Sequence, residues 1–416
     1  MKIAVPFMLG LLLPLCAAAA PQLAQYGVTV NAGASVYPGN VLYSDCMNPN
    51  PDATGNVFLI NQNGASVKQW HSTGNMMEWQ AKPIGTDGSI LTWRYASSTG
   101  NCENGTGKVW LTKIAGNDVA TKIYNDPTCA LNHDFEVLQD GTFLVLCRKF
   151  ITDTTVSTKP FYDDLIRRVD GSGHVLWEWS TDAHYAQLGL STAARHIIMA
   201  GQTVYPVFNP GDPPSSDVFH TNSIQFIPPN ASAASNAAFT PGNILVDQRN
   251  TNLIFAIDYN TGNVVWQVGN ISVGQHAVKM IGSNLPGDGH LLIFNNGSWG
   301  GYPAVVGFSS SVIEYDPIGA KVTWSYSAPY PAGKGFFSPY RGNAQRLPNG
   351  NTFIDDSVWG RIFEVDVNGN VVWEYVPVIG TNKQAANRSI YRAYKVELCW
   401  PGCFAESTTS DGAWTW

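Results

Sequence analysis

Three histidines of this 416-residue chain stand at the head of strand-like segments. They are His133, His220 and His276, in NHDFEVLQDG, FHTNSIQF and QHAVKMIG. Side chains two apart on a strand point the same way, so each histidine is expected on the face of the apolar residues that follow it. A neutral imidazole can attack an electrophile, move a proton or bind a metal ion. A lone histidine of this kind is usually structural, but three at matching positions favour a shared site.

An arginine also recurs at one position. Arg148 stands seven residues after Gly141, and Arg249 stands seven residues after Gly242. Guanidinium groups present fixed donors to oxyanions, which indicates an anionic ligand. A salt bridge to a nearby carboxylate is the alternative, and it applies to Arg148 more than to Arg249 beside the histidines.

A repeated unit supplies the frame for these residues. Each copy ends in a turn, two β-branched residues and an aromatic anchor, as in NGASVKQW, GSGHVLWEW, TGNVVWQV, IGAKVTWSY and NGNVVWEY, with a weaker AGNDVATKIY. Short alternating strands and Gly/Asn turns at a period near fifty residues indicate propeller blades. Six units of four strands predict an all-β fold, a six-bladed β-propeller with four-stranded antiparallel blades.

The last strand-like segment, IYRAYKVEL, is followed by no tryptophan strand. We expect it to return to the first blade, because closing the ring removes exposed sheet edges. The repeated tryptophans are expected to pack between blades. Equivalent ends of the innermost strands surround one channel in a propeller, so His133, His220, His276 and Arg249 are expected to face it.

Composition and targeting signals restrict the function classes. Charged residues make up 13% of the chain, the net charge is −7, and no Lys/Arg run occurs; these features argue against a nucleic-acid partner. Residues 1–20 have the layout of a cleavable secretory signal, and no later apolar run is long enough to span a membrane. We predict a secreted or periplasmic protein with a single propeller domain over 21–416. It has a short N-terminal extension and a Cys-containing tail from about residue 398.

Six cysteines remain once Cys16 is removed with the signal: Cys46, Cys102, Cys129, Cys147, Cys399 and Cys403. An even number in an exported chain favours disulfides over metal binding. Cys399 and Cys403 are close enough in sequence to pair and tether the tail, whereas spacing leaves the other pairings open.

The motifs NHDF, FHTNSIQF, NILVDQRNTNLIFAIDYNTGNVVW, GQHAV with HLLIFNNG, and GNAQRLPNGNTFIDDSVWGRIFEVDVNGNVVWEY resemble the PAPS-independent arylsulfotransferases, in order from about residue 55 to about residue 397. The resemblance implies a six-bladed propeller with a central histidine nucleophile. It makes His276 that nucleophile, with His133, His220 and Arg249 around the sulfuryl group. The substrates would then be a small aryl sulfate and a phenol, transfer would pass through a sulfohistidine, and no cofactor or metal would be required.

Three other functions are compatible with parts of the sequence. Converging imidazoles suit a metal-dependent enzyme, although the cation of Arg249 would oppose a metal charge. AIDYNTGNVVW resembles the tryptophan-docking repeat of quinoproteins, but only one of the six units matches it well. A propeller that binds a ligand without catalysis requires nothing beyond the fold.

Overall fold

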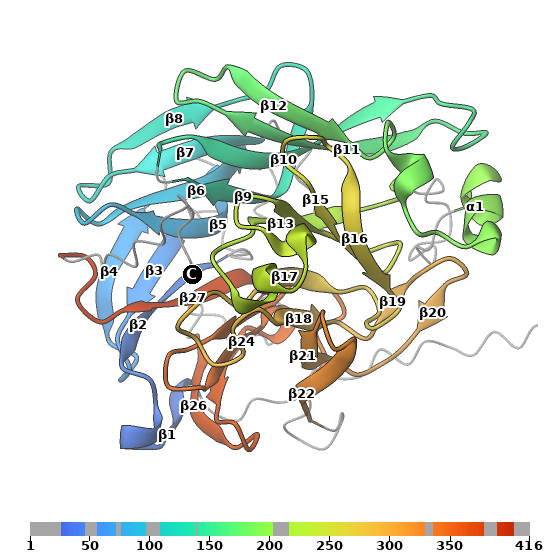
Figure 1. Cartoon of the computed structure of the whole chain (residues 1–416). Helices are drawn as coiled ribbons and strands as arrows, with labels where there is room; N and C mark the ends of the chain where they lie inside the picture. Colours follow the sequence, from blue (N-terminus) through green and yellow to red (C-terminus); the bar gives the residue numbers. More distant parts are fainter. Residues whose placement is uncertain are drawn as a thin grey trace, which may run out of the picture.

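The protein is described by a computed structural model that covers residues 26–45, 56–71, 76–96, 109–138, 140–202, 216–328, 336–377 and 389–402. Six antiparallel sheets of four or five strands stand in a ring (Figure 1). The fold is a six-bladed β-propeller, which confirms the fold class predicted from the repeat. The predicted signal, residues 1–20, lies outside the described residues.

The strands of each blade follow one another from the inside of the ring to its outer edge. Blade one comprises β27 (Ile390–Glu397), β2 (Gly39–Asp45), β3 (Asn56–Ile60) and β4 (Ser66–His71). Blade two comprises β5 (Met76–Ile84), β6 (Ser89–Ala96), β7 (Val109–Ile114) and β8 (Ala120–Tyr124). Blade three comprises β9 (Ala130–Val137), β10 (Phe143–Ile151), β11 (Phe161–Val169) and β12 (Val175–Ser180). Blade four comprises β13 (Thr221–Phe226), β14 (Ile244–Gln248), β15 (Leu253–Ile257) and β16 (Val264–Gly269). Blade five comprises β17 (His276–Met280), β18 (Leu291–Asn295), β21 (Ser311–Asp316) and β22 (Lys321–Ser327). Blade six comprises β23 (Asn343–Arg346), β24 (Thr352–Asp356), β25 (Arg361–Val365) and β26 (Val371–Val376).

The ring is closed by strands from both ends of the described chain. β27 pairs antiparallel with β2, from Glu397 opposite Gly39 to Ile390 opposite Asp45, as predicted for IYRAYKVEL. β1 (Gly27–Asn31) pairs with β26 and adds a fifth strand to the outer edge of blade six. This second closing strand was not predicted, because the short segment carries no repeat signal in the sequence.

Smaller elements decorate the ring. α1 (Thr192–Met199) follows blade three and lies at the periphery (Figure 1). A short hairpin, β19 (Trp299–Gly300) with β20 (Val305–Val306), is inserted in blade five. The 3₁₀ helices are η1 (Gly33–Ser35), η2 (Tyr185–Gln187), η3 (Ala231–Ala234), η4 (Ala237–Phe239) and η5 (Ser357–Trp359). Among the described helices, none has the length and apolarity needed to cross a membrane.

The core lies between blades, where six apolar clusters of described residues each join two neighbours. Buried tryptophans of the outer strands extend into these junctions and donate their indole N–H to a turn of the next blade. The bonds run from Trp70 to Gly88 O (3.0 Å), from Trp179 to Gly262 O (2.9 Å) and from Trp373 to Gln62 O (2.8 Å). For these residues the predicted packing role is confirmed, and the hydrogen bond to the neighbouring turn adds direction to it.

Candidate active site

The innermost strands are irregular where they carry the histidines. Strand pairing shifts register between Thr221 and Ser223 of β13 and between His276 and Lys279 of β17, and a similar shift interrupts β9 against β10. His133 and His220 have φ values of 50° and 54°, in the left-handed region that non-glycine residues seldom adopt. Such bulges redirect side chains. The predicted alternation from each histidine into its strand is therefore wrong at this point, because the extra residues break it.

The four residues singled out in the sequence lie close together in the structure. The rings of His133 and His220 have centroids 4.5 Å apart. His276 is buried close enough to feel the charges of His220 and Arg249, which act to lower its pKa. The Arg249 guanidinium is itself buried, lies 4.8 Å from the ring of Trp299 and donates to Asn250 Oδ1 at 2.9 Å.

Hydrogen bonding fixes the tautomer of His276. The Asn296 side chain donates from Nδ2 to Ser338 O at 2.7 Å and to Arg341 O at 2.9 Å. Its Oδ1 must therefore be the acceptor of the 2.7 Å contact with His276 Nδ1. Nδ1 carries the proton, and the lone pair of the neutral ring is on Nε2.

The same surroundings keep the imidazoles uncharged. Burial, followed by the charges of Arg249 and His220, holds the pKa of His276 well below 6.5. Burial and the charges of His220 and Arg148 similarly lower the pKa of His133. At neutral pH both rings are neutral, which is the form in which an imidazole is a nucleophile or a base.

His220 is oriented by an acidic partner that sequence analysis missed. Its Nδ1 lies 2.7 Å from Asp217 Oδ2. Burial alone would raise the pKa of Asp217, but the charges of His220, Arg148 and Arg249 lower it, so the carboxylate is ionised. Arg148 Nη1 is 3.6 Å from the same oxygen, which confirms the salt-bridge alternative weighed for Arg148.

Two polar neighbours complete the surroundings of the histidines. The hydroxyl of Tyr391 lies 3.1 Å from His133 Nδ1, and burial raises the tyrosine pKa to about 12, so the phenol keeps its proton. Asn222 is buried, and its Nδ2 donates to Gln275 O at 2.9 Å, next to His276 in the chain. In the sequence, only its position two residues after His220 could have marked Asn222 as part of this site.

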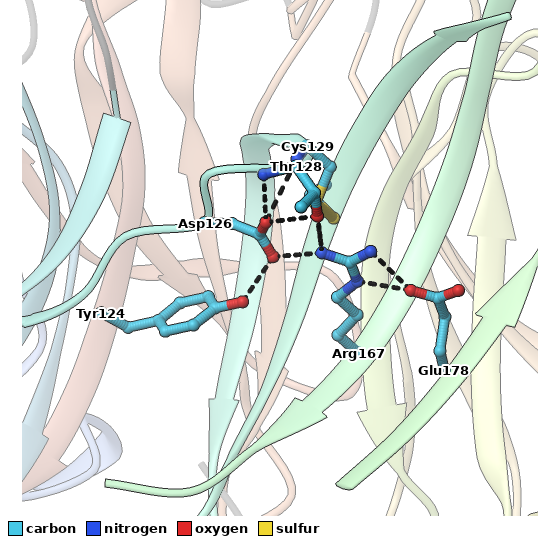
Figure 2. The surroundings of a disulfide bond; sticks show 7 residues. Tyr124, Asp126, Thr128, Cys129, Arg167 and Glu178 are labelled. Carbon is cyan, nitrogen blue, oxygen red and sulfur yellow. Dashed lines mark hydrogen bonds and ion pairs between the residues drawn. A yellow bond between two sulfur atoms is a disulfide. The ribbon is translucent and has the colours of Figure 1, made fainter. Parts of the chain in front are cut away.

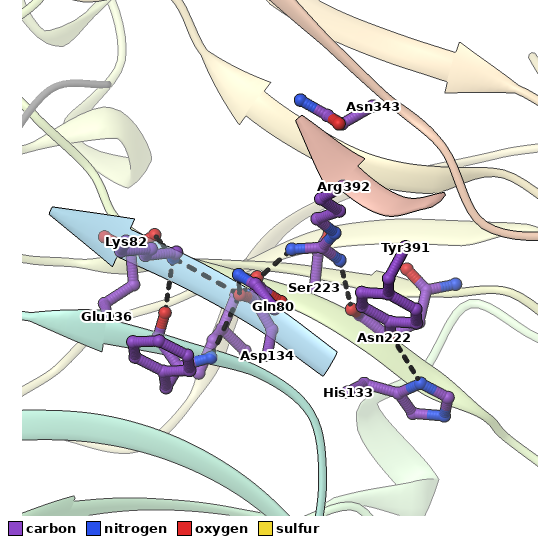
Figure 3. A network of polar contacts seen from close by, with 12 residues as sticks. Gln80, Lys82, His133, Asp134, Glu136, Asn222, Ser223, Asn343, Tyr391 and Arg392 are labelled. Atoms are coloured by element: carbon purple, nitrogen blue, oxygen red, sulfur yellow. Dashed lines mark hydrogen bonds and ion pairs between the residues drawn. The ribbon is translucent and has the colours of Figure 1, made fainter. Parts of the chain in front are cut away.

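A charged network lies beside His133 (Figure 3). Asp134 Oδ1 lies 3.0 Å from Arg392 and 3.3 Å from Lys82, and Lys279 donates to Glu136 at 2.6 Å. Burial opposes ionisation of Asp134, but the cations of Arg392, Lys82 and Lys279 hold its pKa well below 3.8. The cavity among these side chains measures only about 20 Å³. The middle of the ring is therefore packed with paired charges.

The loop before His276 is held from blade four. Gln275 Nε2 donates to Asp247 Oδ1 at 2.9 Å, and Asn252 Oδ1 accepts from Gly274 N at 2.9 Å. Burial raises the pKa of Asp247 to about 8. These contacts fix the backbone on the N-terminal side of His276.

Two of the cysteines on blade three form a disulfide. Cys129, directly before β9, is bonded to Cys147 of β10, beside the pairing of Arg167 with Asp126 and Glu178 (Figure 2). Cys399 is also disulfide-bonded, but the predicted partner Cys403 lies outside the described residues.

The part of the chain that the structure describes contains one group of three metal-ligand atoms within 4.8 Å of one another, from Asp126, Cys129 and Cys147. Both sulfurs are already used in the disulfide. The three histidines proposed for the metal alternative do not form such a group among these residues.

Comparisons with known proteins address the family. A family model described as arylsulfotransferase (ASST) matches residues 101–377, more than half of the chain. No curated protein matches the chain in sequence. Solved structures similar to it include a protein of unknown function from Bacteroides caccae (TM-score 0.47, 14% identity, 86% of this chain and 99% of that one). Another is virginiamycin B lyase from Staphylococcus aureus (TM-score 0.38, 12% identity, 85% of each chain).

Proposed function

Because the chain belongs to the arylsulfotransferase (ASST) family, we propose that it transfers a sulfuryl group from an aryl sulfate to a phenol through a covalent bond to His276. One observation carries the proposal. Asn296 accepts from Nδ1–H of a buried, neutral His276, which leaves the nucleophilic lone pair on Nε2.

In the first half-reaction, Nε2 of His276 attacks the sulfur of the aryl sulfate. The N–S bond forms as the S–O(aryl) bond breaks, and its electron pair leaves with the phenolate. The imidazole gains positive charge during this step, so the hydrogen bond from Nδ1–H to Asn296 Oδ1 strengthens. Splitting the transfer in two in this way replaces one difficult displacement by two easier ones.

In the second half-reaction, the acceptor phenol attacks the same sulfur and the N–S bond breaks, which restores neutral His276. We assign the phenol proton to His220, and the support for this role is Asp217 at 2.7 Å, which would stabilise the resulting imidazolium. His133, whose ring lies 4.5 Å from that of His220, provides a second base at the same place.

Arg249 stabilises negative charge and takes no part in making or breaking bonds. The sulfuryl oxygens remain negative throughout, and a guanidinium already fixed by Asn250 and Trp299 can stabilise them without reorganising. The donor is the aryl sulfate itself, so the reaction requires no PAPS.

We place this reaction outside the cytoplasm, in a secreted or periplasmic protein, because residues 1–20 have the layout of an export signal. Sequencing the N-terminus of the exported protein tests the cleavage directly. A mature chain that still begins at Met1 would contradict it.

The decisive experiment is an assay of purified protein with a chromogenic aryl sulfate, with and without added phenol and in the absence of PAPS. Phenol should accelerate turnover, and protein quenched without acceptor should carry one acid-labile sulfuryl group on His276. A competent enzyme with no adduct, together with kinetics that require both substrates bound at once, would leave direct transfer as the mechanism. Absence of transfer with all aryl sulfates tried would remove the proposed function.

A further inference from the structure

A pocket of about 540 Å³ lies at the edge of blade three next to the histidines. Residues 125–131 line one wall, and Arg148, Lys149, Phe150 and Tyr162 line another. The volume is in the range of sites for small organic ligands, about 300–1,000 Å³. Leu131 of this wall is two residues from His133 on β9, so the pocket and the candidate active site share a strand.

The second wall presents aromatic rings. Phe150 of β10 and Tyr162 of β11 are cross-strand partners with ring centroids 5.1 Å apart and planes tilted by 57°. The Phe150 side chain is 56% exposed, although a phenyl ring of this size is usually covered. Two adjacent rings at the mouth of a pocket offer a surface on which a ligand ring can pack, edge to face or offset.

Arg148 connects this aromatic wall to the histidines. Its guanidinium carbon lies 4.5 Å from the centroid of Tyr162, and its Nη1 lies 3.6 Å from Asp217 Oδ2. Asp217 in turn bonds His220. The Arg148 side chain is about one third exposed, and the residue is part of the pocket lining.

The charge nearest to the two rings is the Arg148 cation. Asp126 is the carboxylate among the lining residues, and Figure 2 shows its oxygens already used by Tyr124, Thr128, Cys129 and Arg167. Arg167 also neutralises its charge. Arg148, which also pairs with Asp217, shares the strand face of Phe150, because side chains alternate along β10.

We propose that this pocket is the subsite for the aromatic ring of the substrates, with the ring packed on Phe150 and Tyr162 and the ester oxygen at the Arg148 end. The inference rests on the proposed function and adds to it a binding site for the leaving group, the aryl phenolate. When the S–O(aryl) bond breaks, its electron pair stays on the phenolate oxygen, and the Arg148 guanidinium stabilises that charge.

The first test measures binding without turnover, using 2-naphthalenesulfonate, whose sulfur is bonded to carbon and is not transferred. Titration by calorimetry should show binding to the wild-type chain, and the variant F150A/Y162L should bind about tenfold more weakly or worse, because two ring contacts are lost. Leu176→Ala removes an equally exposed apolar side chain, 54% exposed, from the outer strand of the same blade. This control should bind as the wild type does. Since Phe150 is exposed, F150A alone provides a variant whose folding should not change.

The second test uses a series of aryl sulfates whose phenols differ in pKa. In Arg148→Gln, the rate of phenol release should depend more steeply on phenol pKa than in the wild type, because the poorest leaving groups need the cation most. A loss of packing alone would lower all rates by one factor.

The outcomes separate the two proposals. If the wild type transfers sulfuryl groups but F150A/Y162L binds the sulfonate and turns over unchanged, the subsite is wrong and the proposed function stands. If the aromatic variants lose sulfonate binding while no chain transfers sulfuryl groups, the pocket stands as an aryl-anion site and the proposed reaction fails. No binding of the sulfonate to the wild type, or an unchanged leaving-group dependence in Arg148→Gln, would overturn the corresponding part of the inference.

Discussion

His276 shows how neighbours, and not residue type, decide what a histidine does. The chain contains eight histidines, but His276 is buried against Arg249 and bonded through Nδ1 to an asparagine whose amide is fixed by two carbonyls. An Asp in place of Asn296 would favour the imidazolium. The neutral amide accepts the proton of Nδ1 without raising the basicity of Nε2 as much as a carboxylate would.

Replacing His276 should therefore have a different effect from replacing Arg249. We expect His276→Ala to abolish both transfer and adduct formation, because no atom is left to form the N–S bond. Arg249→Ala should form the adduct at a rate lower by about 10²–10³, the usual cost of one charge-stabilising donor. Rapid-quench mass spectrometry distinguishes the two, and an adduct in His276→Ala would assign the nucleophile elsewhere.

The pH dependence follows from the neutral state of His276. Its pKa is well below 6.5, so the reactive neutral form persists as the pH falls through that value. The burst of phenol release should stay level from pH 8 to below pH 6.5 and decline only in more acidic buffer. In Arg249→Ala the decline should move to higher pH, because a positive neighbour that opposes protonation is gone. A wild-type decline centred at pH 6.5 or above contradicts the assignment.

At the scale of elements, tryptophans of the outer strands hydrogen-bond the next blade and so link neighbouring blades. Trp373 of β26 is buried and bonds Gln62 O at 2.8 Å in a turn of blade one. Trp373→Phe keeps an aromatic ring but loses this bond and some volume, so we expect a loss of about 1–3 kcal/mol in unfolding free energy. Trp324 bonds Val367 O in the same manner but is only partly buried. Trp324→Phe should lower the unfolding free energy by less in the same urea titration. An equal loss would contradict the link that we assign to buried tryptophans.

β14 contributes a second element-scale effect through Asp247, which holds Gln275 and hence the loop before His276. Burial raises the pKa of Asp247 from 3.8 to about 8. A raised pKa means that its contribution to stability is complete below about pH 4 and is lost progressively as the pH rises toward 8. The stability of Asp247→Asn relative to the wild type should therefore increase between pH 5 and pH 8 and then level off. Urea unfolding at several pH values measures this difference, and a constant difference would show that the carboxyl is ionised throughout.

At the scale of the molecule, β27 both closes the ring and contributes side chains to the candidate active site. It pairs with β2 in blade one, and its residues Tyr391 and Arg392 reach His133 and Asp134. Blade closure and completion of the polar network are therefore the same folding event.

A chain that ends at residue 388 should fail to fold, because β2 is left as an open inner edge and Asp134 loses Arg392. A synthetic peptide of residues 389–416 should restore structure and activity in trans by adding the missing strand. A chain that begins at residue 32 loses only β1 at the outer edge of blade six and should fold with reduced stability. Circular dichroism and the transfer assay report both results; a folded, active chain without β27 would contradict the closure argument.

The sequence alone determined the architecture, because a unit of short alternating strands that ends in tryptophan recurs at a period typical of propeller blades and because closure requires a last strand. It also predicted that His133, His220, His276 and Arg249 would meet, since equivalent strand ends converge in a ring. These conclusions depend on repetition, and a repeat can be read directly from the order of residues along the chain.

Only the tertiary structure decided how these residues are prepared for chemistry. Asn296 and Asp217 are polar residues without a distinguishing motif, and Arg392 is 170 residues from the Asn222 carbonyl that it bonds. The Cys129–Cys147 pairing and the bulges at the histidines likewise depend on which strands lie side by side. Tautomer, charge state and orientation arise from burial and from contacts between distant segments, and no spacing along the chain encodes them.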